Sequence, residues 1–550
     1  MGMHATSSTT ASVSYDAQSE GPTSYFSYGQ HSGTILAHIA LMILGWCFVL
    51  PASVMLSVGR SRLALPSQFL FLIVNVIGLL FGIVYNSQTP DLYENNAHHK
   101  IGWIATWVFG AQVVLGLIFA YAGRGEFKES QSFDHAMFLP VATDELELEH
   151  EHEHESTDPT RDMHENRWSR DSGQGSEPLS PSRESQAEYD NFEKPEEVDP
   201  KQSGLRGWLQ SSTAHQFLSR RAPGMLSNRV LRIFNGVYNV IDRIILPFGF
   251  TAIATGAVTY GGIFHGVEVF NGVAHFIKGG IFFWYGIITL GRFTGAWADL
   301  GWAWNKKPPA SVVGAWKAKV PSAEFVESFV IWMYGVTNVF LEHLAGWGKE
   351  WTARDMEHVS ISIMFFGGGL AGMLFESRRI RVALNNTLIL RSSPTCESED
   401  ESWNPPKSQG VPLNPMPALV ILLLGMMMGS HHQDSMTSTM VHKQWGNMLV
   451  GFAIARGMTY ILLFLHPPTS YLPTRPPTEI AAGFCLMSGG LIFMLSARQV
   501  IESMEFYELD AMFTFTVGMG FTAFIMSLVV VAIAIKAWAV RRERGRNEGC

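Results

Sequence analysis

The chain has few charged residues and few cysteines for its length. Of its 550 residues, 16% are charged, whereas a soluble protein usually carries about 25%. The 4 cysteines form no CxxC pair, which argues against a disulfide framework and against a thiolate zinc site. The first 32 residues contain no lysine or arginine and so lack the basic start of a cleavable signal peptide. We therefore expect the first apolar segment to be an uncleaved membrane anchor.

The common motifs of soluble enzymes are also missing. The sequence contains no P-loop, no GxSxG, no HExxH and no GxGxxG at a strand-to-helix turn, so it offers no phosphate loop, nucleophile elbow or zincin helix. It likewise shows no nucleic-acid-binding motif. The glycine-rich stretch at 367–372 lies inside an apolar segment, where small residues indicate close helix packing.

Long apolar runs are what the sequence does have. Runs of about 18–25 residues match the hydrocarbon thickness of a bilayer, and in lipid they must be helical to satisfy their backbone groups. We predict an all-α integral membrane protein, a polytopic bundle of about eleven transmembrane helices. The expected segments are 33–57, 66–85, 101–122, 244–264, 273–291, 325–344, 359–375, 416–429, 448–465, 480–495 and 512–538.

Basic residues near the segment ends indicate the orientation. They concentrate in alternate loops and in the C-terminal tail, which marks the cytoplasmic side. The prediction is therefore an N-terminus outside and a C-terminus in the cytoplasm. The residues concerned are Arg60, Arg62, Arg124, Lys128, Arg220, Arg221, Arg229, Arg232, Lys306, Lys307, Lys317, Lys319, Arg378, Arg379, Arg381, Arg391, Arg541, Arg542, Arg544 and Arg546.

A long polar loop divides the membrane segments. Residues 123–232 are rich in Glu, Asp, Ser and Pro and contain the histidine-bearing tract DELELEHEHEHES, a composition typical of disorder. This cytoplasmic loop is a candidate binding region for cytosolic partners. The predicted organisation is a polar tail 1–32, a three-helix block 33–122, the loop 123–232, a helical block 233–391, a polar loop 392–412, a helical block 413–539 and a basic tail 540–550.

Histidines gather at one side of the predicted membrane. An ionisable side chain at a membrane segment is a functional-site candidate, and histidine is a common ligand of metals and of haem iron. Ten histidines lie at the outer ends of segments: His38, His98, His99, His265, His275, His343, His358, His431, His432 and His442.

The first group of these histidines belongs to the N-terminal block. His38 lies inside the first segment, and His98 and His99 begin the third. Two neutral imidazoles from different helices at similar depth can clamp a haem iron from both faces. The alternative is that His38 is a buried hydrogen-bonded residue and that the other two form a polar interfacial pair.

This block resembles the transmembrane b-type cytochromes of the cytochrome b561 class. The matching residues are His38, Leu41, Met42, Trp46 and Pro51 in the first segment, with His98, Ile101, Gly102 and Gln112 in the third. The resemblance implies a four-helix core with two haems, in which His38 and His98 would hold the outer haem b.

The sequence departs from that class at the inner side of the membrane. The second segment has no histidine, only Gln68 and Asn75 as polar residues, and the fourth offers Asp242 and Arg243. We therefore expect the inner haem of the class to be missing.

The remaining histidines accompany carboxylates in the C-terminal half. Imidazole with carboxylate is the ligand mixture that suits a divalent transition metal. The alternative is a belt of interhelical hydrogen bonds at the membrane interface. The candidate metal ligands are His265, His275, His343, Glu357, His358, His431, His432, Asp434 and His442.

The whole chain resembles a fungal family described as yeast putative transmembrane proteins. The resemblance rests on LEHL, MEHVSISIMFFGGGLAGM and SHHQD followed by HKQWGN. It implies a multi-pass protein of an endomembrane or the plasma membrane, surrounded by lipid, and supplies no mechanism.

Three functions follow from these patterns. The first is a membrane redox protein, of oxidoreductase type, with one b-type haem near the non-cytoplasmic face. The second is a transporter or metal-handling protein that uses the histidine–carboxylate group. The third is a non-catalytic scaffold that recruits cytosolic partners through the loop 123–232.

Overall fold

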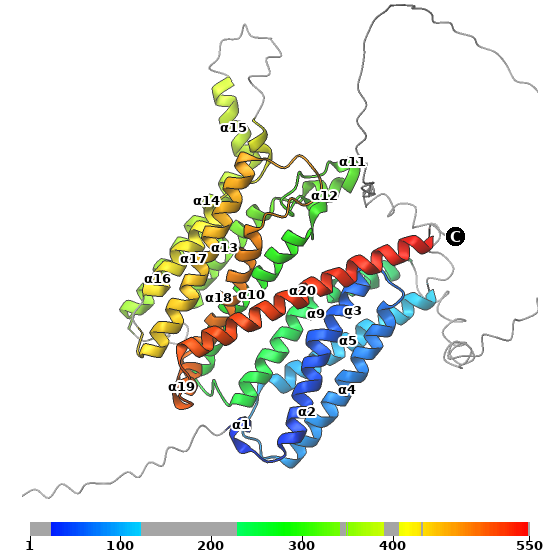
Figure 1. Cartoon of the computed structure of the whole chain (residues 1–550), viewed down its shortest axis with the longest axis vertical. Coiled ribbons are helices and arrows are strands. Elements are labelled where there is room, and N and C mark those ends of the chain that lie inside the picture. The colour runs from blue at the N-terminus through cyan, green and yellow to red at the C-terminus, as the bar shows by residue number, and fades with distance from the viewer. Residues whose placement is uncertain are drawn as a thin grey trace, which may run out of the picture. The chain divides into compact units, whose positions relative to one another are not determined.

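The computed structural model describes residues 24–122, 228–341, 348, 350–389, 406–430 and 433–547, and the regular structure within them is helical (Figure 1). All of these residues belong to one unit, formed by Met1–Phe138 and Arg221–Cys550. The second unit, Leu139–Arg220, lies outside them. The predicted loop 123–232 falls outside the described residues except at its end, where α9 has already begun.

Helices occupy all eleven predicted segments. Among the described residues, nine helices are long and apolar enough to cross a membrane, and α16 is a shorter apolar helix. The chain is therefore a polytopic helical membrane protein. The long helices are α2–η1–α3 (Ser32–Ile43, Leu44–Val49, Leu50–Val58), α4 (Ala64–Gln88), α5 (Ala97–Ala122), α9 (Asn228–Gly261), α10 (Glu268–Thr294), α13 (Ala323–Leu341), α14 (Ala353–Glu376), α16 (Met416–Ser430), α17 (Met436–Leu465), α18 (Thr478–Leu495) and α20 (Ala511–Asn547).

Shorter helices lie between and beside the long ones. Among them, α15 is a polar helix that follows directly on α14, and η3, α11 and α12 lie in the connection between α10 and α13. They are α1 (Tyr25–Tyr28), η3 (Ala298–Leu300), α11 (Ala310–Val313), α12 (Ala315–Lys319), α15 (Arg378–Ile389), η6 (Lys407–Gly410) and α19 (Arg498–Phe506).

The N-terminal helices form a four-helix group. The first span packs along α4, and α5 packs along α9. The first span contains a π-helical segment, η1, just before Pro51, and such segments occur where the regular hydrogen-bond ladder is interrupted. The core of the group includes Trp46, Leu50, Phe71 and Phe109, which are buried together.

The C-terminal helices pack through glycines. A Cβ on Gly279 of α10 would lie 2.5 Å from the carbonyl oxygen of Gly490 in α18, and a Cβ on Gly490 would meet the carbonyl oxygen of Gly279 at the same distance. The predicted role of the stretch 367–372 is confirmed for Gly369, where a Cβ would lie 2.4 Å from the backbone nitrogen of Trp332. Small residues thus let these helix backbones approach closely.

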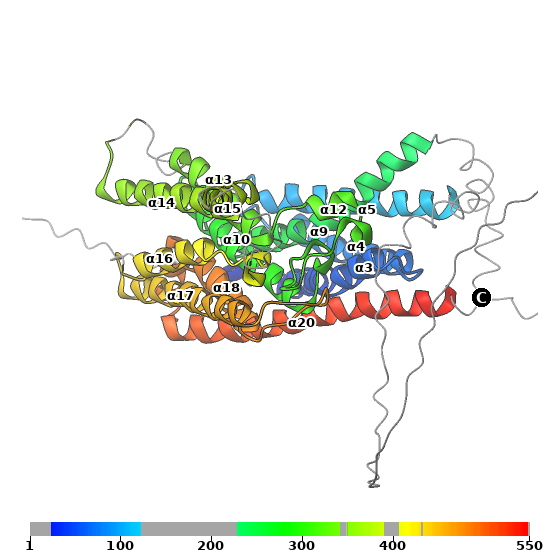
Figure 2. The ribbon, with the colours of Figure 1, turned by 90° about the horizontal axis from the view of Figure 1, so that it is seen from above.

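The last long helix joins the two groups. α20 contacts α3 of the N-terminal group as well as α17 and α18 of the C-terminal group, and Figure 2 shows it running along them. The basic residues that were predicted as a tail from 540 continue this helix to Asn547.

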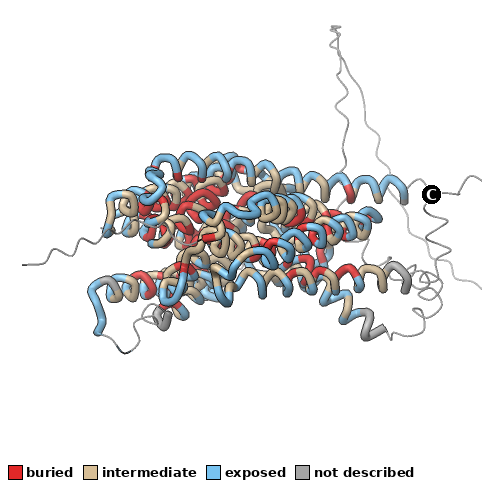
Figure 3. Tube along the Cα trace, turned by 90° about the horizontal axis from the view of Figure 1, so that it is seen from below, coloured by how far each residue is buried: buried red, intermediate tan, exposed pale blue. Residues whose placement is uncertain are grey.

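Apolar side chains cover the outward faces of the helices. Along α4, for example, Leu70, Ile73 and Leu80 are exposed, and Figure 3 shows exposed positions following the outer sides of the long helices. A soluble protein rarely exposes such continuous apolar surface, whereas lipid chains cover it without cost. The burial pattern therefore agrees with the membrane setting.

Two predicted segments begin too late. The segment expected to begin at 244 belongs to α9, which begins at Asn228. The segment expected to begin at 448 is the end of a longer helix, because α17 begins at Met436 behind an N-cap at Ser435, whose hydroxyl accepts from the Ser438 N–H. His442, which we expected in a loop, is consequently a buried residue of this helix.

Candidate functional site

The first candidate site lies between α2 and α5. His38 and His98 face each other there, with ring centroids 6.2 Å apart and ring planes at 77°. The two helices are not neighbours in sequence, because α4 lies between them. The structure therefore brings together the two histidines that the sequence singled out.

Each imidazole is held by a backbone carbonyl of an adjacent helix. The Nδ1 of His38 lies 2.8 Å from the carbonyl oxygen of Gly78 in α4, and the Nδ1 of His98 lies 3.0 Å from that of Ala252 in α9. A carbonyl only accepts, so both Nδ1 atoms donate, and the neutral rings keep Nε2 unprotonated. Metal-ligating histidines are commonly fixed in this way.

A glycine stands one turn beyond each of these carbonyls. A Cβ on Gly82 would lie 2.8 Å from Nδ1 of His38, and a Cβ on Gly256 would lie 3.0 Å from Cε1 of His98. In a helix, the side chain at position i+4 stands beside the carbonyl at position i. Glycine therefore leaves the space through which each imidazole reaches its carbonyl.

The spacing of the two rings fits a single metal ion between them. An imidazole nitrogen binds a metal at about 2 Å, and the ring centroid lies roughly 1 Å behind that nitrogen. Two imidazoles on opposite sides of one iron would then have centroids about 6 Å apart, close to the 6.2 Å between His38 and His98. His38 and His98 are thus the two histidines of this group that could hold a haem iron.

His99 does not take part in this pair. It is exposed, and its backbone N–H donates to the side chain of Asn96, 2.9 Å away. Its predicted role as a cofactor ligand thus gains no support from the geometry, and His98 alone faces His38.

The connections at this end of the bundle are hydrogen-bonded to each other. The hydroxyl of Tyr93, between α4 and α5, lies 2.8 Å from the carbonyl oxygen of Ile263 and 3.0 Å from that of Phe264. Burial raises the pKa of Tyr93, so this hydroxyl stays protonated and remains a donor. The loop before α5 is thereby fixed to the loop after α9.

At the other end of the same bundle, side chains bond to one another. Gln68 of α4 donates to the hydroxyl of Tyr238 at 2.8 Å, and Ser57 donates to Asp242 of α9 at 2.6 Å. Gln112 of α5 also donates to Asp242. These groups come from α3, α4, α5 and α9. They bond to one another in part, while Oε1 of Gln68 and Oε1 of Gln112 are buried without a partner.

The predicted metal ligands are only partly assembled. His275 of α10 interacts electrostatically with His358 of α14 and His442 of α17, so three of them share one region. The Nδ1 atoms of His275 and His442 each lie 2.8 Å from the carbonyl of the residue four positions earlier. His265, Glu357 and Asp434 are exposed.

The other three predicted ligands, His343, His431 and His432, lie outside the described residues. Within the part of the chain that the structure describes, no three or more His, Cys, Asp or Glu side chains are arranged to hold a metal ion. The metal site therefore stays a prediction.

The structure adds a site that the sequence analysis missed. Buried arginines and glutamates of α10, α13, α17 and α18 pair with each other, for example Arg292 with Glu324 at 2.8 Å and Arg456 with Glu479 at 2.9 Å. The sequence feature that could have indicated this site is a charged residue in an apolar segment. Arg456 lies within a predicted segment, and Arg292 directly follows one. The partners could not be paired without the fold.

Comparisons with known proteins place the chain in a family. Residues 248–537 match the family described as Protein YTP1-like, C-terminal, and residues 19–122 match a domain of unknown function, DUF2427. An uncharacterized membrane protein of Schizosaccharomyces pombe is 34% identical over 94% of this chain and 96% of its own length. The chain belongs to the YTP1-like family.

Two further relatives match a smaller part of this chain. An uncharacterized membrane protein of Saccharomyces cerevisiae is 36% identical over 58% of this chain and 51% of its own length. The protein YTP1 of the same yeast is 23% identical over 61% of this chain and 60% of its own length. No solved structure matches the chain.

In this YTP1-like chain, the histidine pair lies in one matched region and the groups next to His98 lie in the other. His38 and His98 lie in the DUF2427 match. Ala252, whose carbonyl binds His98, and Gly256, which leaves space for its ring, lie in the YTP1-like match. The charged pairs of α10, α13, α17 and α18 lie wholly in the YTP1-like match.

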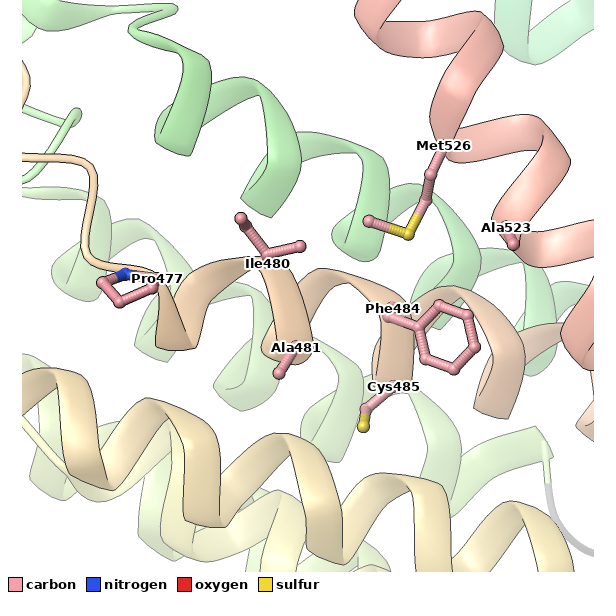
Figure 4. A pocket seen from close by; sticks show the side chains of 7 residues that line it. All are labelled: Pro477, Ile480, Ala481, Phe484, Cys485, Ala523 and Met526. Carbon is pink, nitrogen blue, oxygen red and sulfur yellow. The ribbon is translucent and has the colours of Figure 1, made fainter.

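The YTP1-like region also contains an apolar groove between α18 and α20 (Figure 4). It has a volume of about 570 Å³. Its walls offer no charged group to orient a polar ligand. Its lining residues are Pro477, Ile480, Ala481, Phe484, Cys485, Ala523 and Met526.

Proposed function

We propose that this YTP1-like protein is a membrane redox protein that holds one b-type haem between His38 and His98. The observation that carries the proposal is the facing of these two rings at 6.2 Å, with each Nδ1 bonded to a carbonyl. On the charge-based topology, both histidines lie in the half of the membrane away from the cytoplasm. The haem would therefore lie near the non-cytoplasmic face.

The surroundings of the pair support a haem more than an isolated metal ion. A single metal ion in a protein usually has three or four protein ligands, whereas a haem iron needs only two axial ones. The neighbouring helix faces present the glycines Gly82 and Gly256 and apolar side chains. The sequence resemblance to the b561 class, which rests on the first and third segments, supports the same choice.

A bound haem supplies one-electron chemistry, and the protein sets its potential through the axial ligands and their hydrogen bonds. Here His38 and His98 would hold the iron, and the carbonyls of Gly78 and Ala252 would fix the orientation of the rings. The opposite end of the bundle offers Gln68 and Asp242, which bond to Tyr238 and Ser57, and α4 contains no histidine. This supports one haem per chain. The redox centre would then serve one side of the membrane.

The proposal is tested by absorption spectroscopy of the purified protein, expressed with sufficient haem. We expect an oxidised spectrum that dithionite converts to that of a reduced six-coordinate b-type haem. His38→Ala and His98→Ala should each abolish this spectrum.

His99→Ala is the matched control, because His99 is the neighbour of His98 in sequence but is exposed. It should leave the spectrum unchanged. A colourless wild-type protein, or a spectrum that survives in His38→Ala, would refute the proposal.

A further inference from the structure

Five charged side chains are buried where α10, α13, α17 and α18 meet. We call this set the ionic cluster: Arg292, Glu324, Glu327, Arg456 and Glu479. Arg292 and Arg456 are 2% and 1% exposed, and Glu324 and Glu479 are 1% and 0% exposed. Glu327 is the most accessible member, with 12% of its side chain exposed.

The arginines connect the helices. Arg292 of α10 donates to Glu324 at 2.8 Å and to Glu327 at 2.7 Å, both of α13. Arg456 of α17 donates through Nε and Nη2 to the two oxygens of Glu479 in α18, at 2.9 and 3.1 Å. Its Nη1 lies 3.3 Å from Oε2 of Glu327. Glu327 is thus the link between the two halves of the ionic cluster.

The charges of the ionic cluster do not balance when every carboxyl group is ionised. Two guanidinium groups then face three carboxylates, which leaves one negative charge in excess. An uncompensated charge away from water is expensive, and a buried group escapes this cost by taking up a proton. One proton on one of the three carboxylates makes the cluster neutral.

The hydrogen bonds single out which carboxylate carries the proton. Both oxygens of Glu479 accept from Arg456, and its Oε1 also accepts from Thr459 at 2.7 Å. Both oxygens of Glu327 accept from arginine. Glu324 uses only Oε1, and its Oε2 is buried without a partner. A buried oxygen without a hydrogen-bond donor costs less free energy on a neutral carboxylic acid than on an ionised carboxylate.

Aromatic and hydroxyl groups enclose the ionic cluster. The ring of Trp304 lies 4.1 Å from Cζ of Arg292 and 4.9 Å from that of Arg456. The hydroxyl of Tyr460 and Nε1 of Trp304 are also buried without partners. Hydrogen bonding is thus also incomplete in the aromatic surroundings of the ionic cluster.

Other titratable groups face the ionic cluster from the surrounding elements. The hydroxyl of Tyr285 in α10 lies 3.4 Å from Nη1 of Arg456. Glu376, at the end of α14, accepts from Ser322 at 2.8 Å, and Arg381 of α15 lies next to its backbone. Glu376 is itself an acid, so it cannot neutralise the negative excess of the ionic cluster.

We propose that Glu324 is a proton-binding site of the C-terminal helices. In the folded protein at neutral pH, Oε2 carries a proton that comes from water, and the same O–H bond breaks when the proton leaves. Glu324 lies in the first turn of α13, at the side of the bundle where this helix joins the connection from α10. On the charge-based topology that side is the cytoplasm, opposite to the histidine pair. The inference is independent of haem binding.

Infrared difference spectroscopy of the full-length protein in detergent tests the proposal directly. The wild-type protein should show the C=O stretch of a protonated carboxyl group at neutral pH, shifted in D₂O and lost at high pH. Glu324→Gln should lose this band. The same substitution at Glu502, an exposed residue paired with Arg498, should keep it. A band that persists in Glu324→Gln would overturn the assignment.

Thermal unfolding across pH gives a second readout. An unfolded glutamate titrates near about pH 4.3, so a Glu324 that stays protonated above that value makes the folded state bind more protons than the unfolded state. The unfolding temperature of the wild type should then fall as pH rises through the titration of Glu324. Glu324→Gln mimics the neutral acid, so it should fold and should lack this component. An identical pH dependence in both proteins would contradict the proposal.

A metal cation could also neutralise the excess charge, and a salt series separates the two ligands. With a proton as ligand, replacing KCl by NaCl or by choline chloride at fixed ionic strength should leave the unfolding temperature unchanged. Stabilisation of the wild type, but not of Glu324→Gln, by Na⁺ or K⁺ alone would overturn the proton assignment.

Discussion

Gly82 and Gly256 stand one turn beyond the carbonyl groups that bind the two histidines. Neither glycine was identifiable from sequence, because its partner histidine lies on another helix. The histidines themselves were identifiable, since each is an ionisable residue near the outer end of an apolar segment. The sequence thus revealed the chemical groups of the site and not the backbone that positions them.

Substitution of Gly256 tests this positioning. In Gly256→Ala, the new Cβ would lie 3.0 Å from the ring of His98, so the imidazole must move away from the Ala252 carbonyl. We expect most of the haem absorbance to be lost, together with about 1–3 kcal/mol of stability, the usual cost of overpacking.

Haem absorbance and thermal unfolding in detergent would measure both effects. Gly110→Ala in α5 is the control, because a Cβ there meets nothing within 4 Å, and it should behave like the wild type. Equal haem content in the two variants would show that Gly256 does not position His98.

At the scale of helices, local sequence predicted the long elements well. Each of the eleven apolar segments is a helix, because a membrane leaves no other way to satisfy the backbone of such a segment. The starts of helices were less predictable. α17 begins behind the N-cap Ser435 in a polar stretch, where hydropathy gives no signal.

The contact between α10 and α18 depends on its glycines. Gly279→Leu would place a side chain where the Gly490 carbonyl lies 2.5 Å from the Cβ position, so the two helices would have to separate. We expect a strong loss of folded protein, because α10 and α18 also carry Arg292 and Glu479 of the ionic cluster.

Size-exclusion chromatography and thermal unfolding in detergent would report this loss. Gly520→Leu in α20 is the control, because a Cβ at Gly520 would have no neighbouring atom within 4 Å. This variant should remain monodisperse. Comparable behaviour of the two variants would mean that the glycine contact is not required.

For the whole molecule, the basic residues predict an odd number of crossings. Among the described residues, nine helices are long and apolar enough to cross a membrane, and the number of crossings stays a prediction. The ionic cluster was beyond sequence analysis, since its members come from residues 292 to 479 and only folding brings them together. The basic residues that indicate orientation, by contrast, lie next to single helix ends, so the local sequence is enough to recognise them.

Epitope tags at the two ends test the orientation. In sealed, right-side-out vesicles, protease should remove a tag on the N-terminus and leave a tag on the C-terminus intact until detergent is added. The reverse pattern, or equal exposure of both tags, would contradict the predicted topology and the placement of the histidine pair on the outer side.

The haem-to-protein ratio of the purified protein tests the central claim most directly. The pyridine haemochrome assay measures haem, and amino-acid analysis measures protein. One histidine pair in the N-terminal group, with the polar groups of the opposite end bonded to one another, predicts one haem per chain and none in His38→Ala. A ratio near two, or no haem in the wild-type protein, would contradict the account.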